Sequence, residues 1–191
     1  TVTDTGGTAF SGGMQSLFRH VRGALETAAE WWGIDGAATP IVKRMTGSTS
    51  FANVTLDDAI ATAPKDVVAA TLNGKLFLAY DSTVDRLHVY DPNLGAPRVR
   101  RVSFATPAAP TAANTGAGAY AAVLRYYRVR WLQMTGTTVN RRSEPSASVS
   151  FTPSGAGTHA RVTQPAAAGE GETHWEIEVS LDNSAWTLLA G

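Results

Sequence analysis

The amino-acid sequence predicts an all-β fold, and three observations support this prediction. Residues 125–133 (RYYRVRWLQ) and 174–180 (HWEIEVS) alternate apolar and charged side chains with the period of two that half-buried strands require. Asn73-Gly74 separates the apolar runs 67–72 and 75–80, as expected for a hairpin with a type I′ turn. The composition is rich in Ala, Thr, Ser, Gly and Val, which suits short strands and tight turns better than long helices.

Length, charge and cysteine content limit the possible functions. The 191 residues allow one or two domains, and an apolar content of 43% is enough for a hydrophobic core. Basic and acidic residues balance at 16 each, so no basic half is available to follow a phosphate backbone. The absence of cysteine excludes thiol nucleophiles, disulfides and Cys-ligated zinc. No apolar run is long enough to cross a membrane, so we expect no membrane anchor.

A repeat in the first half predicts propeller-like antiparallel blades. Residues 31–56 align with residues 77–102 at a constant separation of 46 positions, which pairs Asp35 with Asp81 and Leu56 with Val102. Both copies read as apolar strand, Asp-containing turn, apolar strand, Gly-containing turn and apolar strand. Short strands that repeat every 40 to 50 residues or so are typical of propeller blades. We therefore predict a β-rich, blade-like domain over residues 1–105.

Residues 14–34 are compatible with either a helix or strands. Helical spacing is shown by Leu17, Val21, Leu25, Ala28 and Trp32. Gly23 within the stretch and the repeat that begins at residue 31 favour strands instead. Strands are the preferred interpretation, and the helix remains the alternative.

The second half predicts a β-sandwich over residues 106–191. Residues 106–119 contain two prolines and two glycines and are expected to form a linker or an irregular first strand. Strands are then expected at 125–133, 146–151, 174–180 and 185–190, separated by polar turns. By alternation, the side chains expected in the core are Tyr127, Val129, Trp131, Trp175, Ile177 and Val179, and those expected outside are Arg128, Arg130, Glu176 and Glu178.

No set of residues in the sequence predicts a catalytic, cofactor-binding or metal site. Glu176 and Glu178 are neighbours on one strand face, where they cannot flank a glycosidic bond, so we expect them to pair with arginines across strands. Three aspartates do not have the spacing of a calcium loop and are expected to cap turns: Asp81, Asp85 and Asp91. Four histidines are scattered without ligand spacing and are expected to be structural or on the surface: His20, His88, His159 and His174.

Two short arginine clusters could touch DNA. They consist of Arg98, Arg100 and Arg101 in the first half and Arg141 and Arg142 in the second. The preferred interpretation is a solvated strand edge, where charged side chains block unwanted strand pairing, because the chain has no net charge.

The second half resembles the fibronectin type III repeat. The resemblance rests on the strand Tyr127-Arg128-Val129, the turn glycine Gly136, the step Ser143-Glu144-Pro145-Ser146 and the strand that follows. Residues 175–190 (WEIEVSLDNSAWTLLA) are similar to the family's Tyr-x-Val strand, Asp-containing turn and Trp strand. The resemblance implies a fibronectin- or immunoglobulin-like β-sandwich, although the Ser-Glu-Pro-Ser step stands earlier than usual and the last strand is missing.

The whole chain resembles bacteriophage virion proteins. Residues 73–92 (NGKLFLAYDSTVDRLHVYDP), followed by RRVSFATPAAPTAANTGAGAY and the fibronectin-like unit, are similar to the nozzle or tubular proteins of short phage tails. This resemblance implies a structural protein, not an enzyme, without cofactors. It also implies a ring of identical subunits that forms part of the DNA conduit in the tail and is assembled in the host cytoplasm. Adaptor, portal and fibre proteins would be neighbours, and passing DNA would be contacted without specificity.

Two further expectations follow from these predictions. The first is that the chain is part of a larger ring-forming protein, because two blades cannot close a propeller, which typically takes about four to eight. We expect later sequence or neighbouring subunits to complete the ring. The second is an alternative function as a host-surface or carbohydrate-binding adhesion module. An exposed row of aromatic side chains on one sheet face would favour that alternative.

Overall fold

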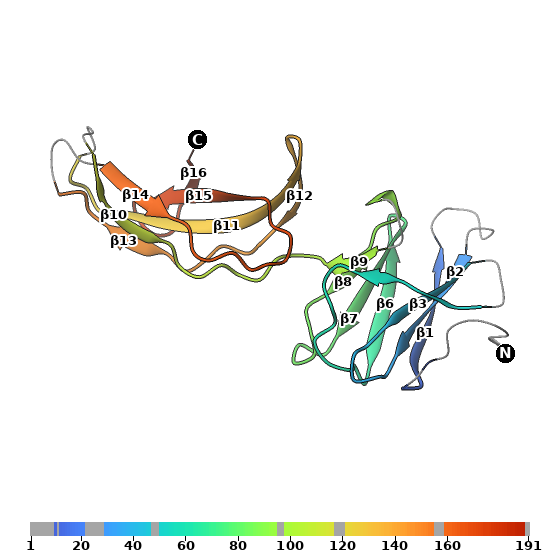
Figure 1. Ribbon diagram of the computed structural model, residues 1–191. Helices are drawn as coiled ribbons and strands as arrows, with labels where there is room; N and C mark the ends of the chain where they lie inside the picture. The colour runs from blue at the N-terminus through green and yellow to red at the C-terminus, as the bar shows by residue number, and fades with distance from the viewer. Residues whose placement is uncertain are drawn as a thin grey trace. The chain divides into compact units, whose positions relative to one another are not determined.

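The computed structural model describes residues 10, 12–21, 29–46, 50–94, 98–116, 121–154 and 159–189. Within these ranges the protein is all-β apart from one short 3-10 helix, η2 (Pro92–Leu94), which confirms the predicted fold class (Figure 1). The chain divides into two compact units, Thr1–Val102 and Ser103–Gly191, close to the boundary expected after residue 105. No helix in the described ranges is long and apolar enough to cross a membrane.

The first sheet of the first unit is a four-stranded antiparallel meander. Its strands follow each other in chain order: β1 (Met14–Val21), β2 (Ala29–Asp35), β3 (Val42–Thr46) and β4 (Ala52–Asn53). The preferred strand interpretation of residues 14–34 is therefore right at both ends of that stretch. Its middle, residues 22–28, lies outside the described residues.

The second sheet repeats this topology. Its meander consists of β6 (Val67–Leu72), β7 (Lys75–Tyr80), β8 (His88–Tyr90) and β9 (Arg98–Arg101). One additional strand, β5 (Thr55–Leu56), follows β4 almost directly and pairs in parallel with β9 at the sheet edge. The repeat found in the sequence thus corresponds to two meanders of the same strand order. Whether they are propeller blades remains a prediction.

The Asp-containing turns and the Asn73-Gly74 turn that the sequence predicts in the first unit are present. The predicted Gly-containing turns fall on residues 47–49 and 95–97, which lie outside the described residues. Asp35 ends β2 and Asp81 follows β7 directly, and each carboxylate accepts a hydrogen bond from the amide two residues on, Ala37 at 3.1 Å and Thr83 at 2.9 Å. Such turns let a short polar side chain replace a backbone acceptor. Asn73 and Gly74 adopt φ values of 50° and 72°, as a type I′ hairpin requires, and join Leu72 to Lys75.

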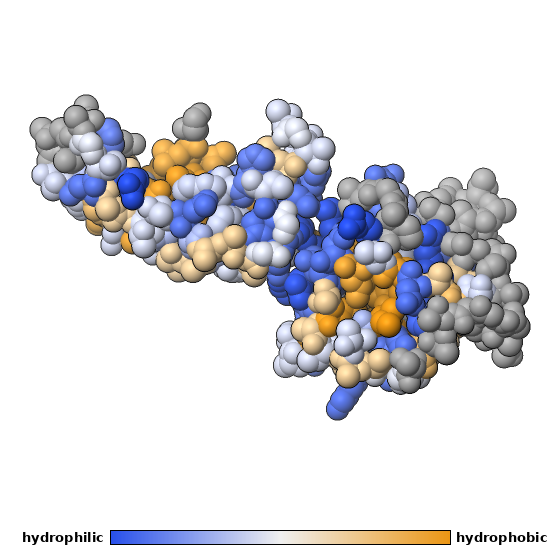
Figure 2. Space-filling model, in the orientation of Figure 1, coloured by the Kyte–Doolittle hydropathy of each residue, from blue (hydrophilic) through white to orange (hydrophobic). Residues whose placement is uncertain are grey.

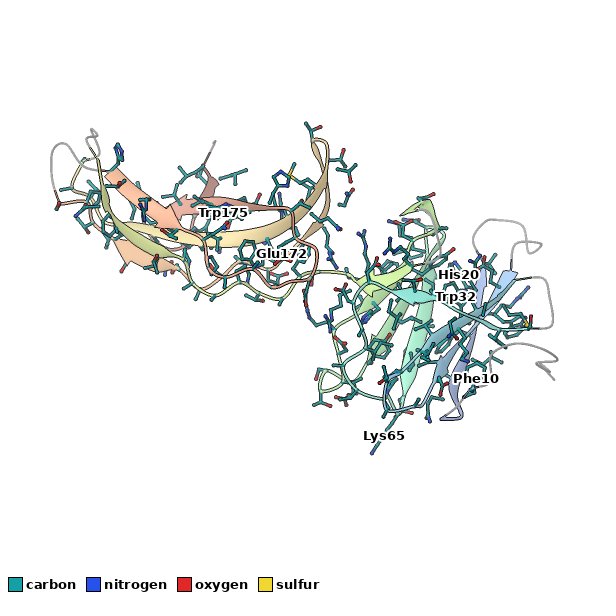
Figure 3. The ribbon with its side chains drawn as sticks, in the orientation of Figure 1. Phe10, His20, Trp32, Lys65, Glu172 and Trp175 are labelled. Atoms are coloured by element: carbon teal, nitrogen blue, oxygen red, sulfur yellow. The ribbon has the colours of Figure 1, made fainter. Side chains whose placement is uncertain are left out.

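The two meanders stack on each other, and one face of each contributes to a single core. The core residues come from both sheets and their connections: Trp32, Ile34, Val42, Val54, Ile60, Leu76, Leu78, Tyr90 and Val99. The ring centroids of Trp32 and Tyr90 lie 4.6 Å apart across the interface. His20 lies beside them, and its Nδ1 is 2.9 Å from Oγ1 of Thr71 on the second sheet (Figure 3).

The first strands of the two meanders run in the same direction. β1 and β6 lie side by side. His20 is the last but one residue of β1, and Thr71 is the last but one of β6, so the hydrogen bond between them joins the corresponding ends of the two strands. The second meander is therefore rotated relative to the first about an axis roughly parallel to the strands. Sheets related in this way pack the front of one against the back of the next.

The second unit is built on one long central strand. This strand, β11 (Arg125–Thr135), pairs on one edge with β15 (His174–Ser180), which in turn carries β16 (Thr187–Leu188). On its other edge it pairs with β12 (Thr138–Arg142) and β13 (Val149–Phe151). A separate two-stranded sheet consists of β10 (Thr111–Thr115) and β14 (His159–Thr163).

The Ser-Glu-Pro-Ser step bridges β12 and β13 along the edge of β11. The amides of Ser143 and Ser146 each donate to a β11 carbonyl, those of Trp131 and Val129, at 2.9 Å. Their hydroxyls accept from the amides of the same two β11 residues, at 2.9 and 3.0 Å. Side-chain oxygens thus take the place of backbone acceptors beside Pro145, which has no amide to donate. The resemblance to a fibronectin type III repeat remains a prediction.

The alternation predicted for the second unit holds on β11 but only partly on β15. Tyr127, Val129 and Trp131 are buried, at 3% exposure or less. Their register partners on β15 are only half-buried: Val179, Ile177 and Trp175. The sheet curls over a small partner sheet, and the face of β15 is covered less completely than that of β11.

Replacing Gly74 by Ala should destabilise the first unit. A Cβ at a φ of 72° costs about 1 kcal/mol or more, so the free energy of unfolding should fall by that amount. Urea denaturation followed by tryptophan fluorescence measures it, with Ser82→Ala in the exposed turn after β7 as the control. Equal stability of Gly74→Ala and the wild type would contradict the turn assignment.

Candidate interaction surfaces

A buried polar cluster lies at the interface between the two meanders. Glu30, only 2% exposed, accepts hydrogen bonds from Nε and Nη2 of Arg44 at 2.9 and 2.7 Å and from Nε1 of Trp32 at 3.1 Å. The Arg44 guanidinium also lies 5.6 Å from the centroid of the Tyr90 ring on the second sheet. The carboxylate is thus compensated by an opposite charge and by donors, as a buried charge must be. The cluster connects the meanders and leaves no carboxylate directed at solvent.

A second polar cluster lies where β8 and β9 meet the loops that contain Asp58 and Asp85. Nε and Nη2 of Arg101 donate to the two oxygens of Asp85 at 2.8 and 3.0 Å, and the Asp85 side chain is 3% exposed. His88 is fully buried, and its ring nitrogens face the carbonyl oxygens of Arg86 at 2.9 Å and Asp58 at 3.1 Å. The neutral imidazole donates to one of these two carbonyls and is enclosed by the fold, so His88 has a structural role.

The pKa values in this second cluster shift for identifiable reasons. Burial opposes the charged form of Asp85, but the hydrogen bonds from Arg101, Ala61 and Arg86 outweigh it and hold its pKa below 3.8. Burial is also the largest influence on His88, and it lowers the pKa of the imidazole below 6.5 although Asp58, Arg86 and Asp85 act in the other direction. Burial, followed by the nearby charge of Asp85, raises the pKa of the Tyr80 hydroxyl.

The three aspartates examined for calcium binding have separate roles. Asp81 and Asp91 cap turns as predicted, since each accepts a hydrogen bond from the amide two residues on. Asp85 does not cap its own turn but binds Arg101 and the amides of Ala61 and Arg86. Among the described residues, no group of three or more His, Asp or Glu side chains could hold a metal ion.

Most arginines that could have contacted DNA are held by partners within their own unit. Arg98 pairs with Asp57 at 2.7 Å, Arg101 with Asp85, and Arg142 with Glu176 at 3.1 Å. The guanidinium of Arg141 lies 3.9 Å from the centroid of the Phe104 ring and is buried. Their charge is largely compensated, so these residues do not form a basic track.

Glu176 and Glu178 pair with arginines across the strands, as the alternation predicted. β11 and β15 place Arg128 opposite Glu178 and Arg130 opposite Glu176. Arg128 binds Glu178 directly, and Nε of Arg130 lies 3.2 Å from Glu178 and 4.0 Å from Glu176. These side chains lie on the outside, as expected, but are less exposed than an outer face implies. Glu176 is only 9% and Glu178 16% exposed, since arginines bind them and the Arg128 guanidinium itself lies 4.0 Å from the centroid of the Trp186 ring.

The outer face of the second meander carries many apolar side chains, with Arg100 at its β9 edge. It is the face turned away from the first sheet, and its residues form rows across the strands. One row contains Ala70, Phe77, Val89 and Arg100, and the next contains Val68, Ala79, Leu87 and Val102. Several apolar side chains of this face are accessible, including Leu72 at the end of β6: Val68 is 70% exposed, Leu72 61%, Leu87 40% and Val102 38%. Figure 2 shows hydrophobic colour on the first unit in the region of β6 and β7.

The outer face of the first meander is partly covered by Phe10, which precedes β1. The Phe10 ring packs against Phe51 with a centroid distance of 5.3 Å and lies below Nζ of Lys43. It lies so close to Gly33 that a Cβ there would come within 2.9 Å of the ring. Nearer to β1 the face is open, and Met14 and Leu17 are 43% and 37% exposed.

The second unit has an open hollow at the end of β15 and a smaller one at its start. The larger hollow, about 600 Å³, is lined by Arg125, Val179, Ser180, Leu181, Asp182, Ala185 and Thr187. Leu181 and Leu188 nearby are 69% and 55% exposed. Asp182 accepts from the amides of Ser184 and Ala185 and serves to fix the turn before β16. The smaller hollow, about 140 Å³, lies between Trp131, Glu172 and Trp175.

No protein-family model, curated protein or solved structure matches this chain.

Acid should destabilise the first unit in two steps. His88 has a lower pKa in the fold than in the unfolded chain, so the unfolded chain takes up the proton first and stability is lost as the pH falls below 6.5. Asp85, whose pKa in the fold lies below 3.8, should give a further loss as the pH falls through and below that value.

The free energy of unfolding, measured in urea at a series of pH values and constant ionic strength, checks this order. In His88→Gln the loss that begins near pH 6.5 should disappear, whereas the exposed His174→Gln should behave as the wild type. An unchanged upper step in His88→Gln would contradict the role given to His88.

Proposed function

We propose that this chain is a structural component of a phage virion, a tail nozzle or tube subunit that associates with copies of itself and lines part of the DNA conduit. One observation carries the proposal. The outer face of the second meander has exposed apolar side chains, with Val68 70% and Leu72 61% exposed. The equivalent face of the first meander is buried, because the second meander packs on it. Exposed apolar surface of this kind marks an interaction site.

A structural role agrees with the chemistry of the polar groups. Glu176 and Glu178 are bound by arginines, Asp85 is bound by Arg101, and His88 faces two backbone carbonyls. A general acid or base has to reach a substrate proton, and these groups are occupied by partners within the fold. The protein proposed here therefore works through its shape and its contacts and not through catalysis.

The assignment to a phage tail rests on the sequence resemblance described above. The ordered pair of meanders, followed by a second β unit, agrees with the strand pattern on which that resemblance was based. The proposed neighbours are other copies of the chain and the adaptor, portal and fibre proteins of the tail. Contact with passing DNA would be weak, because most of the clustered arginines are paired with acidic or aromatic side chains.

The alternative, adhesion to a host surface or carbohydrate, finds less support. Sugar-binding faces usually present aromatic rings to solvent. In the described parts of the chain, the large apolar side chains that are exposed are Met, Leu and Val, and the aromatic ones are buried or half-buried. The structural role is therefore the function that we propose.

The purified chain should self-associate. Sedimentation velocity over a range of protein concentrations should show species larger than a monomer that grow with concentration and persist at high salt, because apolar contacts are not screened. The same preparation should hydrolyse no glycan, peptide or ester. A sharp monomer with one cooperative melt, or turnover that is lost in Glu176→Gln, would count against the proposed function.

A further inference from the structure

We infer that the outer face of the second meander binds the outer face of the first meander of a second copy, so that copies stack head to tail. The inference rests on the self-association in the proposed function and assigns the surfaces that produce it. The occupant is another copy of this chain, because the first unit already contains one interface of the same kind between its own two meanders.

The geometry of the internal interface determines which faces are equivalent. β1 and β6 lie side by side and run in the same direction, and both sheets have the same strand order. A rotation that carries the first meander onto the second therefore carries the buried face of the first onto the outer face of the second. A third meander placed by the same rotation would cover that outer face.

The outer face of the second meander is suited to such a neighbour. Val68, Leu72 and Leu87 project from its surface, and the row across its middle joins Ala70 to Phe77. The internal interface is made of the same kinds of side chain, with Leu76 and Leu78 packed against Trp32 and Ile34. Removing these apolar side chains from water favours association.

The outer face of the first meander supplies the complementary surface. Leu17 lies opposite Gly33 in the register of β1 and β2, on the side away from the core residues Phe18 and Trp32. Leu17 and Met14 are more than a third exposed, and Phe10 extends the apolar surface over Gly33. Docking there continues the internal interface from one copy into the next.

This arrangement differs from a symmetric pair in a way that can be measured. A front-to-back contact joins two different faces, so each added copy leaves one face of each kind open until a ring closes. A symmetric dimer would bury the second meander's outer face in both copies, would stop at two copies, and would not involve Leu17.

The test uses charged substitutions at exposed positions of the full chain. Val68→Lys blocks the outer face of the second meander, Leu17→Lys blocks that of the first, and the exposed Leu188→Lys in the second unit is the control. Leu72→Lys provides a second variant of the Val68 face. Circular dichroism and melting temperature establish that each variant is folded.

Each face variant alone should raise the dissociation constant of self-association at least tenfold, and the control should leave it unchanged. An equimolar mixture of Val68→Lys and Leu17→Lys should form a dimer and nothing larger, because it retains one intact interface. Sedimentation equilibrium of the single variants and of the mixture measures both results.

Three outcomes would overturn the inference. Association that persists in folded Val68→Lys and Leu17→Lys would leave the self-association of the proposed function intact but assign it to another surface. A wild-type chain that stops at a dimer and is sensitive only to Val68→Lys and Leu72→Lys would indicate the symmetric pair. A wild-type chain that stays monomeric at all concentrations would contradict both the inference and the proposed function.

Discussion

The packing of one four-stranded meander on another is the interaction on which the first unit depends. A single meander of short strands leaves both faces in water, and few such sheets are stable alone. Here the contact of Trp32 with Tyr90, surrounded by Leu76, Leu78 and Val99, buries one face of each sheet in a common core. The short segment Ala52–Leu56 pairs with β3 through β4 and then with β9 through β5, so it joins the two sheets covalently and by hydrogen bonds. This single interface buries only one face of each meander, so apolar side chains on the outer face of the second meander stay exposed to solvent.

Polar groups inside that interface limit how the meanders can be arranged. Glu30 has three donors within hydrogen-bonding distance, and His20 reaches Thr71 of the other sheet. A sliding of the sheets would leave the His20 imidazole without Thr71, at a cost of about 1–3 kcal/mol for a buried group that loses its hydrogen bond, and would move the Arg44 guanidinium away from Tyr90. Apolar contacts tolerate small shifts, whereas hydrogen bonds do not. The contacts of His20 with Thr71 and of Arg44 with Tyr90 therefore define the relative position of the sheets, and with it the parallel course of β1 and β6.

In the second unit, the edges of one long strand need hydrogen-bonding partners along their whole length. β11 has eleven residues, but its neighbours β12 and β13 each cover only part of one edge. Ser143 and Ser146 fill the space between them with backbone donors and side-chain acceptors. On the sheet face, the arginines and glutamates of β11 and β15 neutralise each other beneath Trp186. The result is a sheet whose charged face is largely closed to solvent.

The sequence by itself determined the features that depend on neighbouring residues. Period-two alternation located β11 and β15, Asn73-Gly74 located the β6–β7 hairpin, and the 46-residue repeat located two meanders with matching Asp turns. Cross-strand pairing of Arg128 with Glu178 also followed from alternation, because opposite residues in adjacent strands share a face. These features follow from local rules, and they do not depend on how the sheets pack against each other.

Only the tertiary structure decided which faces are buried. Val68 and Leu76 are both apolar strand residues in one hairpin, yet one is 70% and the other 1% exposed. Alternation separates the two faces of a strand but does not say which of them another sheet will cover. The burial of His20, His88 and Glu30, and the low exposure of Glu176, likewise depend on partners that are distant in sequence. Burial is a property of the packed sheets, since it depends on contacts between segments that are distant in the sequence. Local sequence patterns do not predict which of these segments come into contact.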